Sequence, residues 1–117
     1  MRILLADDDE DIRDLTSHLF ARRGWEVAAV TNGDEAIDAL ATGVYDVAVL
    51  DQNMPPGSGL EAAAVRRDAG DGIPIILWTG WGGLIDRAEA ARLDVHVVNK
   101  AEVAGLADAV AALIGAE

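Results

Sequence analysis

The chain has 117 residues, 51% of them hydrophobic and 26% charged, and no cysteine. This apolar content excludes a disordered acidic tail, and the lack of cysteine excludes disulfide frameworks, thiolate metal sites and cysteine nucleophiles. The formal net charge of −12, with scattered lysines and arginines, argues against direct binding to nucleic acid or to a membrane surface. No signal peptide or membrane-spanning run is evident. We therefore expect one cytoplasmic domain over residues 1–117.

Five short apolar runs recur along the chain, and a segment with helical spacing follows each one. The runs are continuously apolar, as strands must be when helices cover both faces of a parallel sheet. They comprise residues 3–6, 27–30, 47–50, 75–78 and 95–98. The sequence therefore predicts five strands that alternate with five helices.

The helical segments carry start and stop signals. The first begins with acidic residues, has apolar residues at helical spacing and ends at Gly24. Asn32 and Glu35 form a capping-box pattern at the start of the second, which Gly43 closes. The remaining helices are expected at about residues 59–69, 83–92 and 102–114.

Right-handed crossovers between five parallel strands favour a doubly wound sheet, for which 2-1-3-4-5 is a common strand order. The predicted fold class is thus α/β, a flavodoxin-like (βα)5 unit with that order. Strands one and three are then neighbours at the switch point, where ligands of such sheets bind outside the C-terminal strand ends.

Acidic residues stand at these two strand ends. Asp7, Asp8 and Asp9 follow the first strand, and Asp51 follows the third. Like charges so close either raise one another's pKa or are held ionised by a cation, and oxygen ligands without His or Cys select a hard ion. Mg²⁺ fits best, because it leaves room for water and a phosphate. An acidic pair after a strand more often only caps the next helix, and Asp9 alone fits that reading.

A turn-rich loop over residues 54–59 follows Asp51 and fixes the backbone near it. Strand four ends at Thr79 and strand five is followed by Lys100, which adds a hydroxyl and an ammonium to the same rim. Taken singly, Thr79 is explained as a turn residue and Lys100 as a solvated charge, without any function. Together they supply a nucleophile, a metal site and donors for the equatorial oxygens, as phosphoryl transfer requires.

These motifs stand at a characteristic spacing. They are Ile-Leu-Leu-Ala before Asp7-Asp8-Asp9, Val-Leu-Asp51 with Met54-Pro55 and Gly59, then Thr79-Gly80 and Lys100. The set resembles the receiver domains of two-component response regulators over essentially the whole chain. It implies a single-domain, chemotaxis-regulator-like receiver. A free-standing regulator, a phosphorelay intermediate and a receiver from a hybrid kinase or a longer regulator are all open alternatives.

The resemblance implies roles for the acidic residues. Asp51 would accept the phosphoryl group and bind Mg²⁺. Asp8 would be a direct metal ligand and Asp7 a ligand mostly through water. Asn53 would offer its backbone carbonyl to the metal.

The resemblance also implies a signalling cycle. A sensor histidine kinase or a histidine phosphotransferase would supply the phosphoryl group from a phosphohistidine. Thr79 would hydrogen-bond that group, Gly80 would leave space beside it and Lys100 would pair with it. Engagement by Thr79 would rearrange the fourth helix, the fifth strand and the fifth helix, changing affinity for an unknown downstream protein. Beyond its own phosphorylation and dephosphorylation, no enzyme activity is implied.

The residues around Lys100 depart from the pattern of the family. Ala101 stands where receivers usually have proline, so the cis peptide common there is not expected. Asn99 and Glu102 form a capping-box pattern, which would place Lys100 in the first turn of helix five.

Two aromatic positions also differ. Val97, beside His96, stands where many receivers have an aromatic switch residue, so no tyrosine-type rotamer switch is expected. Trp81 stands where the side chain overhangs the acceptor, and we hypothesise that it limits water access and slows loss of the phosphoryl group. Packing on the loop or contact with a partner is an equal alternative for Trp81.

Three other functional classes share some features with this sequence. A haloacid-dehalogenase-type phosphatase would need a second Asp where Asn53 stands, and also a cap domain. A nucleotide-binding module would need a glycine-rich turn after strand one, where this chain has acids. The serious rival is a phosphorylation-independent pseudo-receiver that acts as an interaction module. The joint presence of the acidic residues, Thr79 and Lys100 argues against it.

Overall fold

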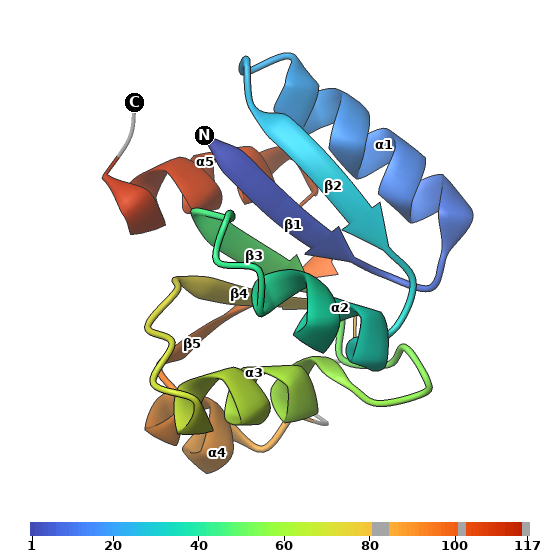
Figure 1. Ribbon diagram of the computed structural model, residues 1–117. Coiled ribbons are helices and arrows are strands. Elements are labelled where there is room, and N and C mark those ends of the chain that lie inside the picture. The colour runs from blue at the N-terminus through green and yellow to red at the C-terminus, as the bar shows by residue number, and fades with distance from the viewer. Residues whose placement is uncertain (81–84, 101–102, 116–117) are drawn as a thin grey trace.

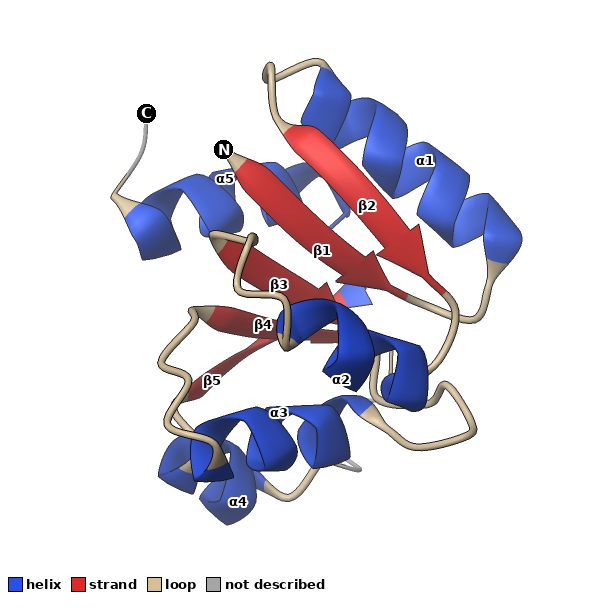
Figure 2. Ribbon diagram, viewed as in Figure 1, coloured by secondary structure: helices blue, strands red, loops and turns tan. Residues whose placement is uncertain are grey.

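The computed structural model describes residues 1–80, 85–100 and 103–115, which form a five-stranded sheet between two layers of helices (Figures 1 and 2). The strands are β1 (Arg2–Ala6), β2 (Glu26–Val30), β3 (Val47–Leu50), β4 (Ile75–Thr79) and β5 (Val95–Asn99). The helices are α1 (Glu10–Ala21), α2 (Gly33–Leu40), α3 (Gly59–Asp68), α4 (Arg87–Arg92) and α5 (Val103–Ile114).

All strand pairs are parallel, in the order β2-β1-β3-β4-β5. The predicted flavodoxin-like fold and its strand order are therefore confirmed. The register matters for function, because Ala6 of β1 pairs with Leu50 of β3. The residues that follow, Asp7 and Asp51, consequently emerge side by side.

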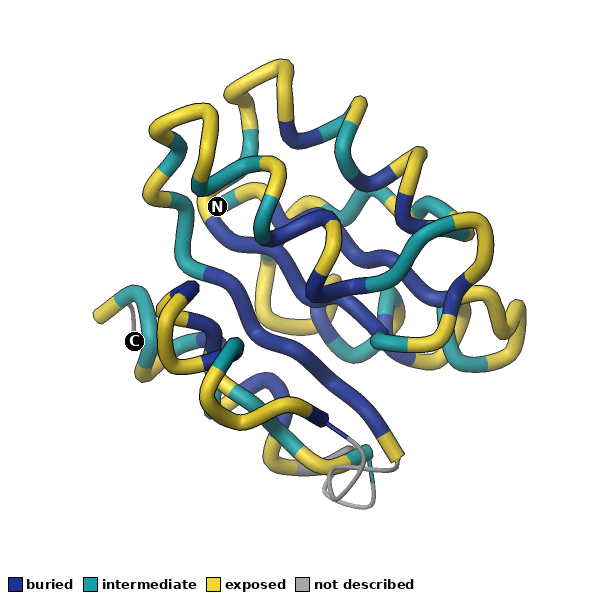
Figure 3. The backbone as a smooth tube through the Cα atoms, turned by 90° about the horizontal axis from the view of Figure 1, so that it is seen from below, coloured by how far each residue is buried: buried dark blue, intermediate teal, exposed yellow. Residues whose placement is uncertain are grey.

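The three central strands explain the continuously apolar runs. Every residue of β3 and β4, and every residue of β1 after Arg2, is buried. One face packs against α1 and α5, and the other packs against α2, α3 and α4. Buried segments accordingly run through the middle of the molecule, with exposed positions on the outer turns of the helices (Figure 3). Successive side chains of a central strand point to opposite faces of the sheet. Because helices cover both faces, these side chains enter two different cores, and neither set faces solvent.

The helix starts follow local capping chemistry. The Asp9 side chain caps α1 by accepting hydrogen bonds from the N–H groups of Asp11 and Ile12. This confirms the interpretation of Asp9 as a helix cap. Asn32 caps α2 by accepting from the Glu35 N–H at 2.8 Å. The capping box is only half formed, because the Glu35 carboxylate accepts from the Thr31 N–H rather than from Asn32.

Helix α4 begins later than the sequence analysis predicted. We expected a start near residue 83, but the helix starts at Arg87, after Asp86 in an extended conformation. The Asp86 side chain accepts from the Glu89 N–H at 3.0 Å, which fixes this start. Residues 83, 84 and 102 lie outside the described part, so the predicted start of α5 at Glu102 is not described.

Arg67 in the last turn of α3 joins two chain segments that precede β4 and β5. Its Nε donates to the Leu93 carbonyl at 2.7 Å, and its Nη1 donates to the carbonyls of Asp71 and Ile73 at 2.9 and 2.8 Å. Its Nη2 reaches the Asp94 carbonyl at 3.3 Å. One guanidinium thus satisfies carbonyl groups of both connections. Of the helices described, none combines the length and the apolar character that crossing a membrane would need.

Candidate functional site

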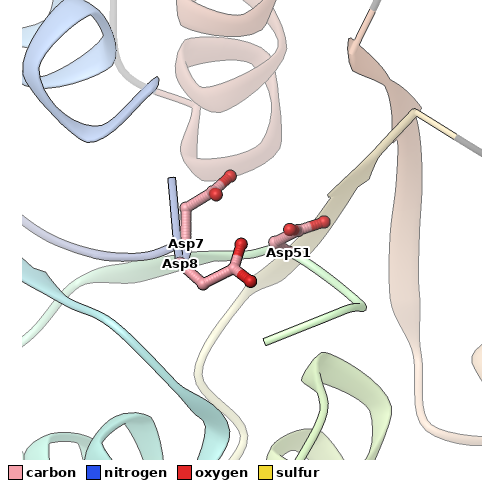
Figure 4. A group of neighbouring side chains, drawn as sticks. All are labelled: Asp7, Asp8 and Asp51. Atoms are coloured by element: carbon pink, nitrogen blue, oxygen red, sulfur yellow. The ribbon is translucent and has the colours of Figure 1, made fainter. Parts of the chain in front are cut away.

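The acidic residues meet where β1 and β3 end. The Asp51 N–H donates to the Ala6 carbonyl at 2.9 Å, which continues the β1–β3 pairing up to the site. Asp7 is fully buried, Asp51 is 7% exposed and Asp8 is exposed. One carboxylate oxygen from each of these three residues lies within 4.8 Å of the others. Figure 4 shows the three side chains gathered beyond the strand ends.

Lys100, directly after β5, reaches the same place. Its Nζ lies 2.6 Å from Asp7 Oδ2 and 3.3 Å from Asp51 Oδ2. Thr79, the last residue of β4, is buried at the rim. An open cavity of about 270 Å³ lies over the site. The residues lining it are Asp8, Asp51, Asn53, Thr79, Gly80 and Lys100. Among the described residues, the structure therefore brings together the predicted metal-binding and phosphoryl-binding positions, with Asp7 joined through Lys100.

The charges at this site do not balance. Three carboxylates and one ammonium leave a formal charge of −2. Burial raises the pKa of Asp51, the charge of Asp7 raises it further, and Lys100 only partly opposes this. Burial alone would lower the pKa of Lys100, but its hydrogen bond to Asp7 and the charges of both acids outweigh burial and raise it. The site thus retains negative charge that a divalent cation can neutralise.

Hydrogen-bond donors from the backbone and from one arginine side chain fix Asp7 and Asp51. The Asp9 N–H donates to Asp7 Oδ1 at 2.9 Å, and the Arg13 guanidinium donates to the Asp7 carbonyl at 2.8 Å. The Gln52 N–H donates to Asp51 Oδ1 at 2.8 Å. The sequence analysis missed Arg13 and Gln52. A basic residue one helical turn after the Asp9 cap was the available signal for Arg13, whereas the Gln52 contact is made by the backbone and has no residue-type signal.

The loop after Asp51 is tied to the start of α3. Gln52 accepts from the Leu60 N–H through its side chain at 2.9 Å, and Asn53 forms an isolated bridge with Ser58. A Cβ at Gly59 would lie 2.5 Å from the Asp51 carbonyl oxygen, so only glycine allows this approach. Close packing against the Asp51 backbone therefore explains why the sequence motif has glycine at position 59.

The same loop also touches the start of α2. The Gly33 N–H donates to the carbonyls of Met54 and Pro56 at 3.2 and 3.1 Å. A Cβ on Gly33 would lie 2.7 Å from the Ser58 nitrogen. The loop therefore packs directly against the backbone of α2.

Other positions named from the sequence have mixed outcomes. His96 is exposed and Val97 is half-buried on the edge strand β5. Trp81, Ala101 and Glu102 lie outside the described residues. The expectations for the Trp81 shield, for the peptide after Lys100 and for the Asn99–Glu102 capping box therefore stay predictions.

Comparison with known proteins places these features in a family. The model of the response regulator receiver domain matches residues 3–110. The chain is 32% identical over 93 residues to the transcriptional regulatory protein DltR of Streptococcus agalactiae serotype III (strain NEM316), covering 80% of this chain and 42% of that protein. It is 36% identical over 87 residues to the response regulator MprA of Mycobacterium avium (strain 104), covering 74% of this chain and 38% of that protein. The chain thus spans well under half of the curated relatives it matches.

Solved structures agree with the fold over nearly the full length. The response regulator TrrA from Thermotoga maritima, in complex with Mg²⁺-BeF, has a TM-score of 0.85 and 33% identity, covering 96% of this chain and 97% of that one. The chemotaxis protein CheY4 from Vibrio cholerae has a TM-score of 0.84 and 26% identity, with 96% and 97% covered. The acidic pocket of Asp7, Asp8 and Asp51 with Lys100 fits an aspartate phospho-acceptor and is typical of a metal-binding receiver site. Together with the match over residues 3–110, this shows that the chain belongs to the response regulator receiver domain family.

Proposed function

We propose that Asp51 takes a phosphoryl group from a phosphohistidine in the presence of Mg²⁺, and that Thr79 and Lys100 contact the transferred group. The observation that carries the proposal is the meeting of three carboxylates and one ammonium at an open cavity. A receiver domain is not a conventional enzyme. In this proposal the domain, taken as residues 1–117, turns over only its own phosphoryl group.

The donor set at the site supports Mg²⁺ as the cation. All three side-chain donors are carboxylates, and hard oxygen ligands with room for water and phosphate suit this ion. We assign exposed Asp8 as a direct ligand and Asp7, whose Oδ2 is engaged by Lys100, as a ligand through water. Asp51 and the backbone carbonyl of Asn53 complete the proposed set. When bound, Mg²⁺ supplies positive charge next to the phosphoryl oxygens.

In this proposal Asp51 acts as the nucleophile of the transfer. A lone pair of its carboxylate attacks phosphorus in line with the P–N bond of the phosphohistidine. The new P–O bond forms as the P–N bond breaks, and the imidazole nitrogen keeps the electron pair of the broken bond. Lys100 and Thr79, which share the cavity lining with Asp51, then lie beside the acyl phosphate. Their donors offset charge on the equatorial oxygens.

The partners follow from this chemistry. A sensor histidine kinase or a histidine phosphotransferase would present the phosphohistidine. A relative supports this assignment: the TrrA protein of similar fold, 33% identical, has been solved in complex with the histidine kinase ThkA. Phosphorylation would shift the domain between states that differ in affinity for a downstream protein. A cytoplasmic location is part of the proposal and agrees with a cysteine-free chain.

Intact-mass spectrometry after incubation with phosphoramidate tests the acceptor, because the P–N bond of this donor models a phosphohistidine. We expect a Mg²⁺-dependent gain of one phosphoryl mass that Asp51→Asn abolishes. Asp38→Asn, a matched change of an exposed acid on α2, should leave the gain intact. No gain under any condition would refute the proposal and favour the pseudo-receiver, whose partners bind the unmodified domain.

A further inference from the structure

A tryptophan lies beneath the lysine of the site. Trp78 is 1% exposed and directly precedes Thr79 in β4. Its register partner in β5 is Val98, two residues before Lys100. The Lys100 Nζ lies 5.5 Å from the centroid of the Trp78 ring. The ammonium therefore contacts an aromatic ring as well as the two carboxylates.

This contact has the geometry of a cation–π interaction. Indole presents the most negative ring face among the aromatic side chains, and attraction extends to about 6 Å from the centroid. The Lys100 side chain is only 21% exposed, so solvent weakens the attraction less than it would at an open surface. The ammonium thus has acids and a ring among its neighbours, and loss of the ring leaves its position less constrained.

A second observation sets Trp78 apart from ordinary core residues. Its Nε1–H is buried and has no hydrogen-bond partner among the described residues. Buried donors are normally satisfied, since an orphaned one is costly, and the other members of this core cluster are wholly apolar. A leucine or a phenylalanine in this place would avoid that cost. The indole therefore occupies, despite that cost, a core position whose ring contacts the site lysine.

We propose that Trp78 is a positioning residue for Lys100: its ring holds the ammonium at the level of the Asp7 and Asp51 carboxylates, ready to meet the incoming phosphoryl group. This inference rests on the proposed function for its kinetic consequence. The contact itself does not depend on phosphorylation. Trp78 touches neither the phosphoryl donor nor the metal in this scheme and acts only through Lys100.

A double-mutant cycle tests the proposal. The rate of Mg²⁺-dependent phosphorylation by phosphoramidate is measured for wild type, Trp78→Leu, Lys100→Met and the double variant. We expect Trp78→Leu to slow the wild-type reaction roughly fivefold, with Trp78→Phe in between, and to have almost no further effect in the Lys100→Met background. An equal effect in both backgrounds would mean that Trp78 only packs the core, and no effect in either would also overturn the proposal.

A fluorescence comparison separates failure of this inference from failure of the proposed function. The emission of Trp78 is obtained by subtracting the spectrum of Trp78→Leu from that of wild type, and again in the Lys100→Met background. Removal of a nearby ammonium should change this difference spectrum even if no phosphorylation occurs. Identical difference spectra in the two backgrounds would show that the Lys100 ammonium does not contact the Trp78 ring. Where thermal unfolding shows that Trp78→Leu does not fold, Trp78→Phe takes its place in both experiments.

Discussion

Replacement of Asp51 by Asn should stabilise the metal-free domain at neutral pH. The carboxylate of Asp51 is buried beside two other acids, and its pKa is raised first by burial and then by the charge of Asp7. A neutral side chain of the same shape removes that repulsion. The residue proposed to carry the function is thus expected to reduce the stability of the fold that holds it.

The size of the effect follows from distances at the site. Two unit charges 4.8 Å apart, the upper limit for these oxygens, repel by about 3.5 kcal/mol at an effective dielectric of 20. Asp51 has two such neighbours, and attraction to Lys100 at 3.3 Å offsets about 5 kcal/mol. The balance is about 2 kcal/mol, and solvent screening of exposed Asp8 reduces it. We therefore expect a gain of about 1–2 kcal/mol, or about 4–8 °C in Tm.

The stabilisation by Asp51→Asn should depend on pH. Because the pKa of Asp51 is raised on folding, its destabilising effect is absent below about pH 4, where the acid is protonated in both states. The effect grows with pH and is complete above the folded-state pKa. Thermal unfolding of wild type and Asp51→Asn in EDTA, between about pH 4 and about pH 7, measures the difference.

Two controls make this test specific. Asp8→Asn should stabilise less, because exposed Asp8 is screened by solvent. Saturating Mg²⁺ should stabilise wild type and cancel the advantage of the Asp51→Asn variant, since Asp51 is a proposed ligand. An Asp51→Asn variant that melts no higher than wild type in EDTA, or whose advantage does not grow with pH, would refute the electrostatic reasoning.

Four further substitutions test other features of the molecule. Gly59→Ala should lower the free energy of unfolding by about 2 kcal/mol, because the new Cβ would lie 2.5 Å from the carbonyl oxygen of Asp51. By contrast, Gly105→Ala in α5 should raise the free energy of unfolding by about 0.5–1 kcal/mol, because a Cβ there meets nothing within 4 Å. Urea denaturation measures both changes, and equal effects would contradict the packing argument. Lys100→Met should tighten Mg²⁺ binding in calorimetric titration, because the acids lose their competing cation, and unchanged or weaker binding would speak against that competition. Arg67→Met should lower the free energy of unfolding by about 2 kcal/mol as charged hydrogen bonds to four carbonyls are lost, a loss that denaturation in urea would reveal.

Local patterns made the fold predictable from the sequence. The continuously apolar runs indicated a sheet covered on both faces, and Asn32 marked the start of α2 correctly. The start of α4 was predicted too early, although Asp86 with Glu89 three residues later gave the signal of a cap. Glycine-rich sequence before Asp86 carried no comparable start signal. Boundaries were therefore predictable where a cap was recognised.

Contacts between distant segments were not predictable in the same way. The strand order brought the acids, Thr79 and Lys100 to one edge, but it did not say that Lys100 would contact Asp7 more closely than Asp51. The ring of Trp78 under that lysine depends on the β4–β5 register and on rotamers. The four carbonyl partners of Arg67 likewise come from loops whose shape no residue pattern encodes. Sequence reasoning thus located the site without its geometry.

The contact of Gly33 with the loop after Asp51 bears on how such a domain can diverge. The first residue of α2 stands 18 positions before the acceptor in the chain, yet a single added methyl there would collide with the Ser58 backbone. Substitutions at the start of α2 and in the loop over residues 54–58 are therefore not independent during evolution. A library that randomises both segments together should yield functional pairs of residues that fail when either is transplanted alone.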